Sequence, residues 1–120
     1  MSNLPNCWIV DAVRTPTGKR NGSLSGYHPA ELGGLVVDAL LERTQINTST
    51  LPIEDVIIGC VSQVGAQSSN IARGIVLSSS LPLTVPATTV DRQCGSSLQA
   101  LTAAADRVWA GSHCVLAGGV

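Results

Sequence analysis

Apolar residues along the chain follow two patterns that alternate from one end to the other. Short, continuous apolar runs rich in valine, isoleucine and alanine are typical of strands buried on both faces of a sheet. Between them, longer segments repeat apolar residues every three or four positions, as helices that pack against a sheet do. The predicted strands are residues 7–16, 56–64, 86–91 and 113–119, and the predicted helices are residues 29–44, 71–80 and 95–110. The order β-α-β-α-β-α-β predicts an α/β fold with a mostly parallel sheet and helices packed on it.

Local signals indicate where the helices begin and how closely they pack. Pro29 occupies a favoured first helical position, and Glu31 follows in the first turn, where the helix dipole favours a negative charge. Asn70 is placed to cap the second helix. Gly33 and Gly34 each lower the helix propensity by about 1 kcal/mol relative to alanine. We therefore expect the first helix to pack closely against a neighbouring backbone.

The composition is that of a globular domain with little charge. Of 120 residues, 44% are hydrophobic and 12% are charged, and the formal net charge is -1. We expect residues 1–120 to form one domain or one piece of a larger protein. So little positive charge argues against nucleic-acid binding. No apolar run reaches the roughly 20 residues that span a bilayer, and the first residues do not resemble a signal peptide, so a cytoplasmic protein is expected.

Four cysteines are spread along the chain, and three of them lie in apolar runs. Their spacing lacks the close pairs and neighbouring histidines of a zinc site, so no metal is expected. Cys7, Cys60 and Cys114 lie inside predicted strands, where a cysteine usually acts as a small buried apolar residue. Cys94 differs because Asp-Arg-Gln precedes it and Gly-Ser-Ser follows it. This polar setting indicates a functional site.

Cys94 also falls at the junction of a predicted strand and the helix that follows it. In a parallel sheet, ligands bind beyond the carboxyl ends of the strands. The first turn of a helix presents backbone N–H groups and a partial positive charge, which favour a thiolate and can stabilise an oxyanion on a bound thioester. Gly95 would allow a substrate to approach, and Ser96 or Ser97 could cap the helix, although turn formation alone would also explain both serines. The junction predicts a cysteine nucleophile.

Four motifs, in this order along the chain, resemble the N-terminal part of a thiolase, an acyl-CoA:acetyl-CoA C-acyltransferase. They are VDAVRTPTGK near the start, SNIARGIVL in the middle, DRQCGSSLQA at the cysteine and LAGGV at the end. The resemblance implies that residues 1–120 are an N-terminal thiolase domain, one incomplete half of the thiolase fold. It also implies that the CoA-binding loop region belongs to the other half.

The resemblance further implies what the complete protein does. Cys94 would be acylated by an acyl-CoA, and its own backbone N–H would contribute to an oxyanion hole. The acyl group would then pass to acetyl-CoA to form a 3-ketoacyl-CoA, or the reverse reaction would cleave one in fatty acid or lipid metabolism. Coenzyme A is expected as the carrier of both substrates, with no covalently bound cofactor. Cys94 is the one residue of this chain to which the resemblance assigns a catalytic role.

Two positions depart from the thiolase pattern and keep alternatives open. Thiolases usually have asparagine where Asp91 stands and glycine where Ser97 stands, and Cys-Gly-Ser-Ser leans toward the Cys-Ser-Ser-Ser run of ketosynthases. The RTPTGK motif is thiolase-like and places thiolase first. The alternatives are a ketosynthase-like condensing enzyme and a non-catalytic fragment or interaction subunit that retains the half-fold.

The other groups that thiolases need do not match residues of this chain. The family uses a histidine in a Gly-His-Pro motif and a second cysteine in a Cys-x-Gly motif, both in its C-terminal half. We expect His28 to cap a helix or lie at the surface and His113 to begin a strand, and we assign no acid/base role to Cys60 or Cys114. The 120-residue chain alone is therefore expected to be inactive. We also expect a homodimer or tetramer that pairs through the strand at 86–91, or a partner chain that supplies the C-terminal half.

Overall fold

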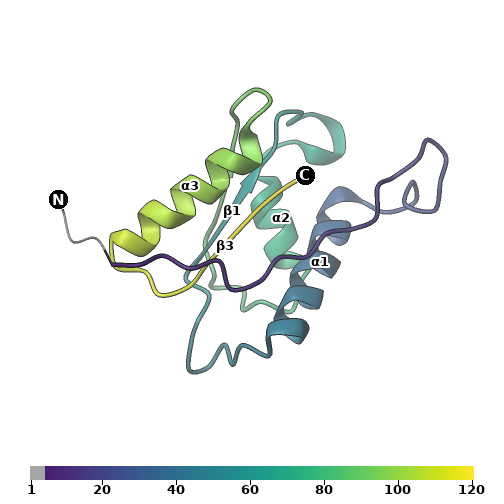
Figure 1. Cartoon of the computed structure of the whole chain (residues 1–120). Helices are drawn as coiled ribbons and strands as arrows, with labels where there is room; N and C mark the ends of the chain where they lie inside the picture. Colours follow the sequence, from purple (N-terminus) through teal and green to yellow (C-terminus); the bar gives the residue numbers. More distant parts are fainter. Residues whose placement is uncertain (1–4) are drawn as a thin grey trace.

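A computed structural model describes residues 5–120 of the chain (Figure 1). Its helices are α1 (Pro29–Thr44), α2 (Ile71–Leu77) and α3 (Ser96–Trp109), with a short 3-10 turn, η1, at Gly65–Gln67. Its strands are β1 (Asp55–Gly59), β2 (Ala87–Val90) and β3 (Val115–Gly119). Both strand pairs are parallel and the strand order is β2-β1-β3, so the predicted α/β class with a parallel sheet is confirmed. The predicted domain also includes residues 1–4, which lie outside the described residues.

The sheet lies between two helical layers. Figure 1 shows α1 and α2 on one side of the sheet and α3 on the other. Successive side chains of a strand point to opposite faces, so β1 contributes to both layers. Val56 and Ile58 pack with residues of α1 and α2, whereas Ile57 packs with Ala100 and Ala104 of α3. Burial on both faces explains why β1 is apolar without alternation.

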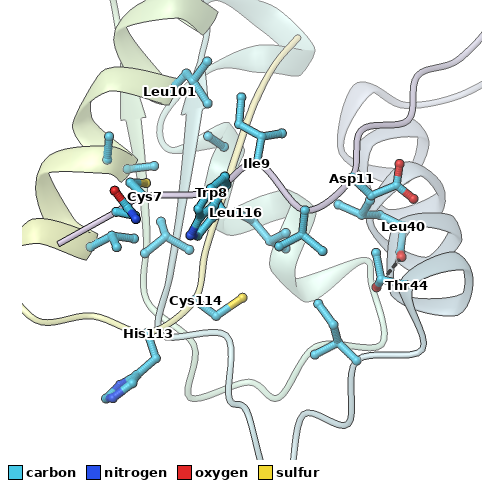
Figure 2. Close-up of a pocket in the computed structure, with 18 of the residues that line it drawn as sticks. Cys7, Trp8, Ile9, Asp11, Leu40, Thr44, Leu101, His113, Cys114 and Leu116 are labelled. Atoms are coloured by element: carbon cyan, nitrogen blue, oxygen red, sulfur yellow. Dashed lines mark hydrogen bonds between the residues drawn. The ribbon is translucent and has the colours of Figure 1, made fainter.

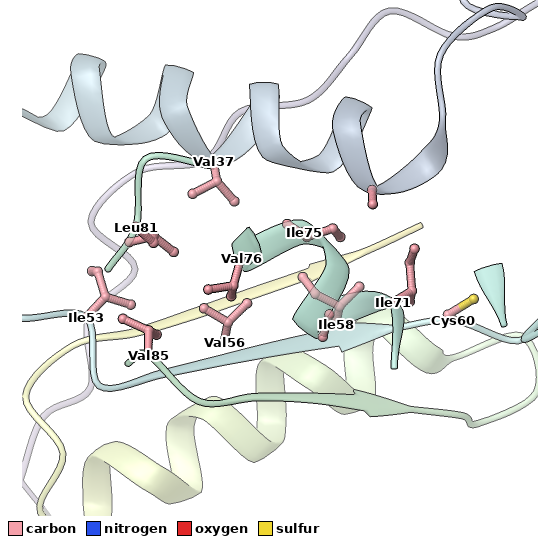
Figure 3. Packing of buried hydrophobic residues seen from close by; sticks show 12 residues of the cluster. Val37, Ile53, Val56, Ile58, Cys60, Ile71, Ile75, Val76, Leu81 and Val85 are labelled. Carbon is pink, nitrogen blue, oxygen red and sulfur yellow. The ribbon is translucent and has the colours of Figure 1, made fainter. Parts of the chain in front are cut away.

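The larger core cluster fills the space between the sheet and the layer of α1 and α2 (Figure 3). Val56 of β1 and Val76 of α2 are fully buried and lie side by side near its centre. Burying a side chain of this size contributes about 1.5–3 kcal/mol. No helix within residues 5–120 is long and apolar enough to cross a membrane.

The predicted first strand, at residues 7–16, is wrong. Within the described chain, no backbone hydrogen bond joins this segment to the sheet, and β1 pairs directly with β2 and β3. Side chains hold the segment instead. Asp11 forms a 2.8 Å ion pair with Arg43 of α1, and the Trp109 indole of α3 donates a 3.0 Å hydrogen bond to the Pro5 carbonyl. The segment therefore runs across the sheet from α3 to α1 and forms no ladder (Figure 1).

The apolar side chains of this N-terminal segment remain largely exposed. Trp8, Ile9 and Val10 are 77%, 73% and 74% exposed. Two cavities of about 510 and 450 Å³ lie along the segment and share Leu101 and Leu116 in their walls; Figure 2 shows the first. A strand-like composition does not produce a strand here, because a strand also needs a ladder partner and burial.

The other predicted elements are present, some with shorter bounds. The strand predicted at 56–64 ends at Gly59, and the helix predicted at 71–80 ends at Leu77. Beyond Leu77, the Ser79 hydroxyl donates to the Val76 carbonyl at 2.9 Å. A local bond of this kind competes with the helical pattern and favours a turn.

Close packing of the first helix is confirmed. A Cβ added at Gly34 would lie 2.5 Å from the carbonyl oxygen of Ser78, and one at Gly33 would lie 2.5 Å from the Ile75 side chain. The two glycines therefore let α1 approach α2, and this packing compensates for their low helix propensity.

β1 and α3 also approach closely, at the carboxyl end of the strand. A Cβ at Gly59 would overlap the backbone carbonyl of Ser96 and the amide nitrogen of Ser97. A Cβ at Gly119, at the end of β3, would lie 2.7 Å from the Cβ of Ser97. The start of α3 thus rests on two strand ends that have no side chains.

We predict that Gly59→Ala destabilises the protein by about 1–3 kcal/mol, the usual cost of forcing an extra methyl group into a packed interior. The atoms that the methyl group would meet are backbone atoms, which cannot rotate away. Gly26→Ala is the matched control, because nothing lies within 4 Å of a Cβ added there. Its effect should stay within about 0.5 kcal/mol. Denaturant unfolding followed by circular dichroism measures both, and equal stabilities for the two variants would contradict the packing at Gly59.

Candidate active site

Cys94 lies in a turn between the carboxyl end of β2 and the start of α3. The residue is exposed, and its backbone φ is 61°. A residue other than glycine rarely adopts this left-handed conformation, which costs about 1–3 kcal/mol. Such a conformation persists only where the surrounding structure enforces it. The predicted placement at a strand–helix junction is confirmed, and the role of Cys94 as nucleophile stays a prediction.

Ser96 closes this turn from inside the protein. Its hydroxyl accepts a 3.0 Å hydrogen bond from the Arg92 N–H and donates a 2.9 Å hydrogen bond to the Arg92 carbonyl. The Gly95 N–H donates to the same carbonyl at 2.8 Å. Ser96 is buried, with 8% of its surface exposed. Residues 92–96 therefore form a tied loop, called here the Cys94 loop.

The expectation that Ser96 or Ser97 caps α3 is wrong. The N-cap residue is Gly95, and no side chain bonds to the helix there. The Ser96 hydroxyl is instead used inside the Cys94 loop. No side-chain cap therefore competes for the first-turn N–H groups of α3, which a bound anion or oxyanion can use.

Asn70 and Thr89 connect α2 to the strand that leads to Cys94. The Asn70 carboxamide accepts from the Arg73 N–H at 3.2 Å, which confirms the predicted cap of α2. It also accepts from the Thr89 hydroxyl at 2.7 Å and donates to the Ala87 carbonyl at 2.8 Å. This network fixes β2 against α2, and with it the strand that enters the Cys94 loop.

Arg73 binds backbone carbonyl groups of a distant segment, and nothing in the sequence pattern indicates these bonds. Its guanidinium donates to the Val85 carbonyl at 2.8 Å and to the Leu83 carbonyl at 2.7 Å. These partners are 12 and 10 residues further along the chain, in the irregular segment before β2. Carbonyl groups occur at every residue, so no motif marks the ones that a distant arginine will bind.

Both histidines make contacts away from the Cys94 loop. His28 is the N-cap of α1, where its imidazole and the Glu31 carboxylate form a reciprocal capping box, so the predicted cap is confirmed. His113 lies just before β3, and its Nδ1 is 3.0 Å from the Glu54 carboxylate. That pair is at the amino ends of β1 and β3, whereas Cys94 follows the carboxyl end of β2. Neither histidine is hydrogen-bonded to the loop.

The four cysteines are free thiols that differ in access, and one expectation about them fails. Cys60 is buried as expected, with 1% exposure. Cys114 is half-buried, and its burial, followed by the negative charge of Glu54, raises the pKa of its thiol. Cys7 is exposed because the N-terminal segment lies outside the sheet, so the expectation that it is buried is wrong. Cys94 and Cys7 are thus the two exposed thiols.

The arrangement supports covalent chemistry at Cys94 with a substrate that arrives from solvent. The thiol is exposed, and the helix that follows it begins without a side-chain cap. The N–H groups at a helix start can hold an oxyanion formed when a thiol attacks a carbonyl group. Among residues 5–120, no three His, Cys, Asp or Glu side chains gather as metal ligands would.

We predict the following order of alkylation by iodoacetamide near neutral pH: Cys94, Cys7, Cys114 and Cys60. Cys94 and Cys7 are both exposed, but Cys94 also adjoins the start of a helix. Cys114 reacts more slowly because its raised pKa leaves less thiolate, and Cys60 reacts only when the fold opens. Peptide mapping after limited alkylation gives the order. Faster labelling of Cys7 than of Cys94 would remove the physical basis for Cys94 as nucleophile.

Comparison with known proteins places this fold and this loop in a family. Residues 7–120 match the family profile described as thiolase, N-terminal domain. A steroid 3-ketoacyl-CoA thiolase of Mycobacterium tuberculosis is 46% identical over 118 residues, which are 98% of this chain and 28% of that protein. A beta-ketoadipyl-CoA thiolase of Acinetobacter baylyi is 42% identical over 118 residues, which are 98% of this chain and 29% of that protein. A 3-ketoacyl-CoA thiolase of Alcanivorax borkumensis is 46% identical over 114 residues, which are 93% of this chain and 29% of that protein.

The matched region contains the whole Cys94 loop. The chain spans less than a third of the length of each of these curated relatives. All three bear thiolase names, which favours the thiolase resemblance over the ketosynthase alternative. Since the profile matches all of residues 7–120, the chain belongs to the thiolase family, with the sequence and fold of its N-terminal domain.

Proposed function

We propose that Cys94 is the nucleophile of a thiolase that transfers acyl groups between CoA thioesters. The observation that carries the proposal is the exposed Cys94 thiol, in a left-handed turn directly before α3. A thiol on the residue before the N-cap of a helix is suited to attack a thioester carbonyl, because the N–H groups at an uncapped helix start can hold the resulting oxyanion. Membership of the thiolase family supports this reaction class.

The reaction proceeds in two halves on the same sulfur. The Cys94 thiolate attacks the carbonyl carbon of an acyl-CoA, and the tetrahedral oxyanion collapses with departure of the CoA thiolate. The backbone N–H of Cys94 is one donor to that oxyanion. In the second half, acetyl-CoA loses a methyl proton to a base, and its carbanion attacks the acyl-Cys94 carbonyl. Cys94 leaves as a thiolate and a 3-ketoacyl-CoA is released, or the reverse sequence cleaves one.

The groups that move protons in this reaction lie outside the 120 residues in our proposal. His28 caps α1, and His113 is paired with Glu54. Cys60 is buried, and Cys114 is half-buried with a raised pKa. Residues 1–120 are accordingly the N-terminal domain of a working unit that further sequence or a partner chain completes. The span of less than a third of each relative supports this view.

The substrate class follows from the names of the relatives. Those names specify a steroid 3-ketoacyl-CoA, a beta-ketoadipyl-CoA and a 3-ketoacyl-CoA. The shared element is a 3-ketoacyl CoA thioester, so we propose a substrate of that class, with CoA as its carrier and a role in lipid or related acyl-CoA metabolism. The four free thiols fit a reducing, cytoplasmic setting.

We predict that the protein with its complete thiolase sequence acquires one acetyl group on Cys94 from acetyl-CoA. Cys94→Ser should lower acyl transfer by on the order of 10⁴-fold or more, because loss of a nucleophile removes the covalent route. Cys7→Ser is the matched control, since Cys7 is also exposed, and it should retain activity. Intact mass and peptide mapping locate the adduct, and CoA release measures the rate. An acetyl group on another residue, or full activity of Cys94→Ser, would exclude the proposed role.

We also propose that two copies of the protein pair through β2. The strand order β2-β1-β3 places β2 at an edge of the sheet, and exposed edges invite pairing with another chain. The Asn70 side chain already bonds to the Ala87 carbonyl at the start of β2. A second copy would therefore pair with the rest of the strand, next to the Cys94 loop. A shared edge there would make the two sites neighbours.

Sedimentation at micromolar concentration should show a dimer or a larger even-numbered assembly. Thr88→Lys, at an exposed position of β2, should shift it toward monomer, because charged side chains, lysine above all, keep sheet edges apart. Thr17→Lys adds the same charge at an exposed position of the N-terminal loop and should leave the assembly unchanged. A wild-type monomer, or equal effects of the two variants, would contradict pairing through β2.

A further inference from the structure

We propose that Ser96 is a positioning residue whose hydroxyl holds Cys94 in its left-handed conformation. The inference rests on the proposed function, in which Cys94 is the nucleophile, and it concerns how the protein sets the geometry of that nucleophile. Cys94 is exposed, has a φ of 61° and belongs to neither of the two core clusters of the described residues. The restraint must come from the residues on either side of it.

The Ser96 hydroxyl provides that restraint through both of its hydrogen-bonding functions. It accepts from the Arg92 N–H at 3.0 Å and donates to the Arg92 carbonyl at 2.9 Å. Both bonds join residues four apart, so they close the chain around Cys94. The backbone of Ser96 is itself fixed, because the bare end of β1 at Gly59 lies against it. The two hydrogen bonds therefore tie the Cys94 loop to a part of the backbone that is held in place by the sheet.

The two bonds are not equally replaceable when the hydroxyl is removed. The Arg92 carbonyl keeps its 2.8 Å bond from the Gly95 N–H, but the Arg92 N–H loses the partner that Ser96 supplies. An N–H without a partner in the protein is stabilised by turning toward water. Arg92 is exposed, so the loop can open to make that turn. Opening the loop allows Cys94 to relax to a negative φ, which changes the direction in which its side chain leaves the backbone relative to the start of α3.

Ser97 provides a matched comparison within the same helix turn. It is the same residue type, it is exposed, and no hydrogen bond of its hydroxyl is found within residues 5–120. Ser97→Ala therefore removes the same atom without touching the Cys94 loop. Ser96→Thr keeps the hydroxyl and tests whether that group, and not the exact side chain, is required.

The test is competitive alkylation with iodoacetamide in the folded protein, which needs no acyl-CoA. The labelling rate of Cys94 measures the effect of each variant on the Cys94 loop. The rate of the exposed Cys7 corrects for the activity of the reagent, and labelling of the buried Cys60 shows whether the fold has opened. We expect Ser96→Ala to lower the ratio of Cys94 to Cys7 labelling by about fivefold or more, the fold-change to which the smallest cost of this backbone conformation corresponds. Ser97→Ala and Ser96→Thr should stay within about twofold of the wild type. Labelling of Cys60 should remain slow in all three.

An unchanged ratio in folded Ser96→Ala, or the same loss in Ser97→Ala, would overturn the proposal. If rapid Cys60 labelling shows that Ser96→Ala does not fold, Ser96→Thr and Ser96→Val replace it, since they have the same shape and differ in the hydroxyl. A lower ratio in the valine variant supports the proposal, and equal ratios or an unfolded valine variant overturn it in favour of a purely structural serine. The acetyl-CoA adduct on wild-type Cys94 is measured separately. Loss of that adduct would count against the proposed function alone.

Discussion

The contact between the sheet and the first turn of α3 sets the position of everything around Cys94. Gly59 ends β1 directly against the peptide that joins Ser96 to Ser97, and Gly119 ends β3 against the Ser97 side chain. Neither position has room for a Cβ, so these two contacts limit how closely the start of α3 can approach the sheet. Because backbone contacts fix the start of the helix, the Cys94 loop that precedes it also ends at a fixed position.

The other end of the same loop is fixed independently. Asn70, at the start of α2, holds β2 through the Ala87 carbonyl and the Thr89 hydroxyl. The chain therefore has only the residues between Val90 and Ser96 in which to leave the strand and enter the helix. A short connection between two fixed elements leaves few backbone conformations, and a positive φ at Cys94 is the solution seen here. The two anchored elements limit the path of the chain, and within that limit the Ser96 hydroxyl closes the loop in which Cys94 has its positive φ.

Much of this fold is readable from local sequence. The predicted helix at 29–44, with its proline start, its His28 cap and its close glycine packing, is present as predicted. The placement of Cys94 at a strand–helix junction is also predictable, because a polar break between an apolar run and a helical repeat marks such a junction. The strand at 7–16 fails for a different reason: its residues suit a strand, but β1 is already flanked by β2 and β3, and side-chain contacts at Asp11 hold the segment elsewhere. Local composition does not contain that information.

The features that sequence does not reveal are those that depend on two distant segments meeting. Ser96 reads as a helix cap in the sequence, but in the structure its hydroxyl bonds back to Arg92 and its backbone lies against Gly59. The same logic explains how a thiolase site can be divided between separate parts of a sequence. The geometry of the proposed nucleophile needs only a sheet end, a tied loop and a helix start, all of which lie within residues 59–119. Proton transfer needs no covalent continuity with that unit, because a base acts through hydrogen-bond reach alone. A domain that holds Cys94 in place can therefore still depend on other sequence for turnover.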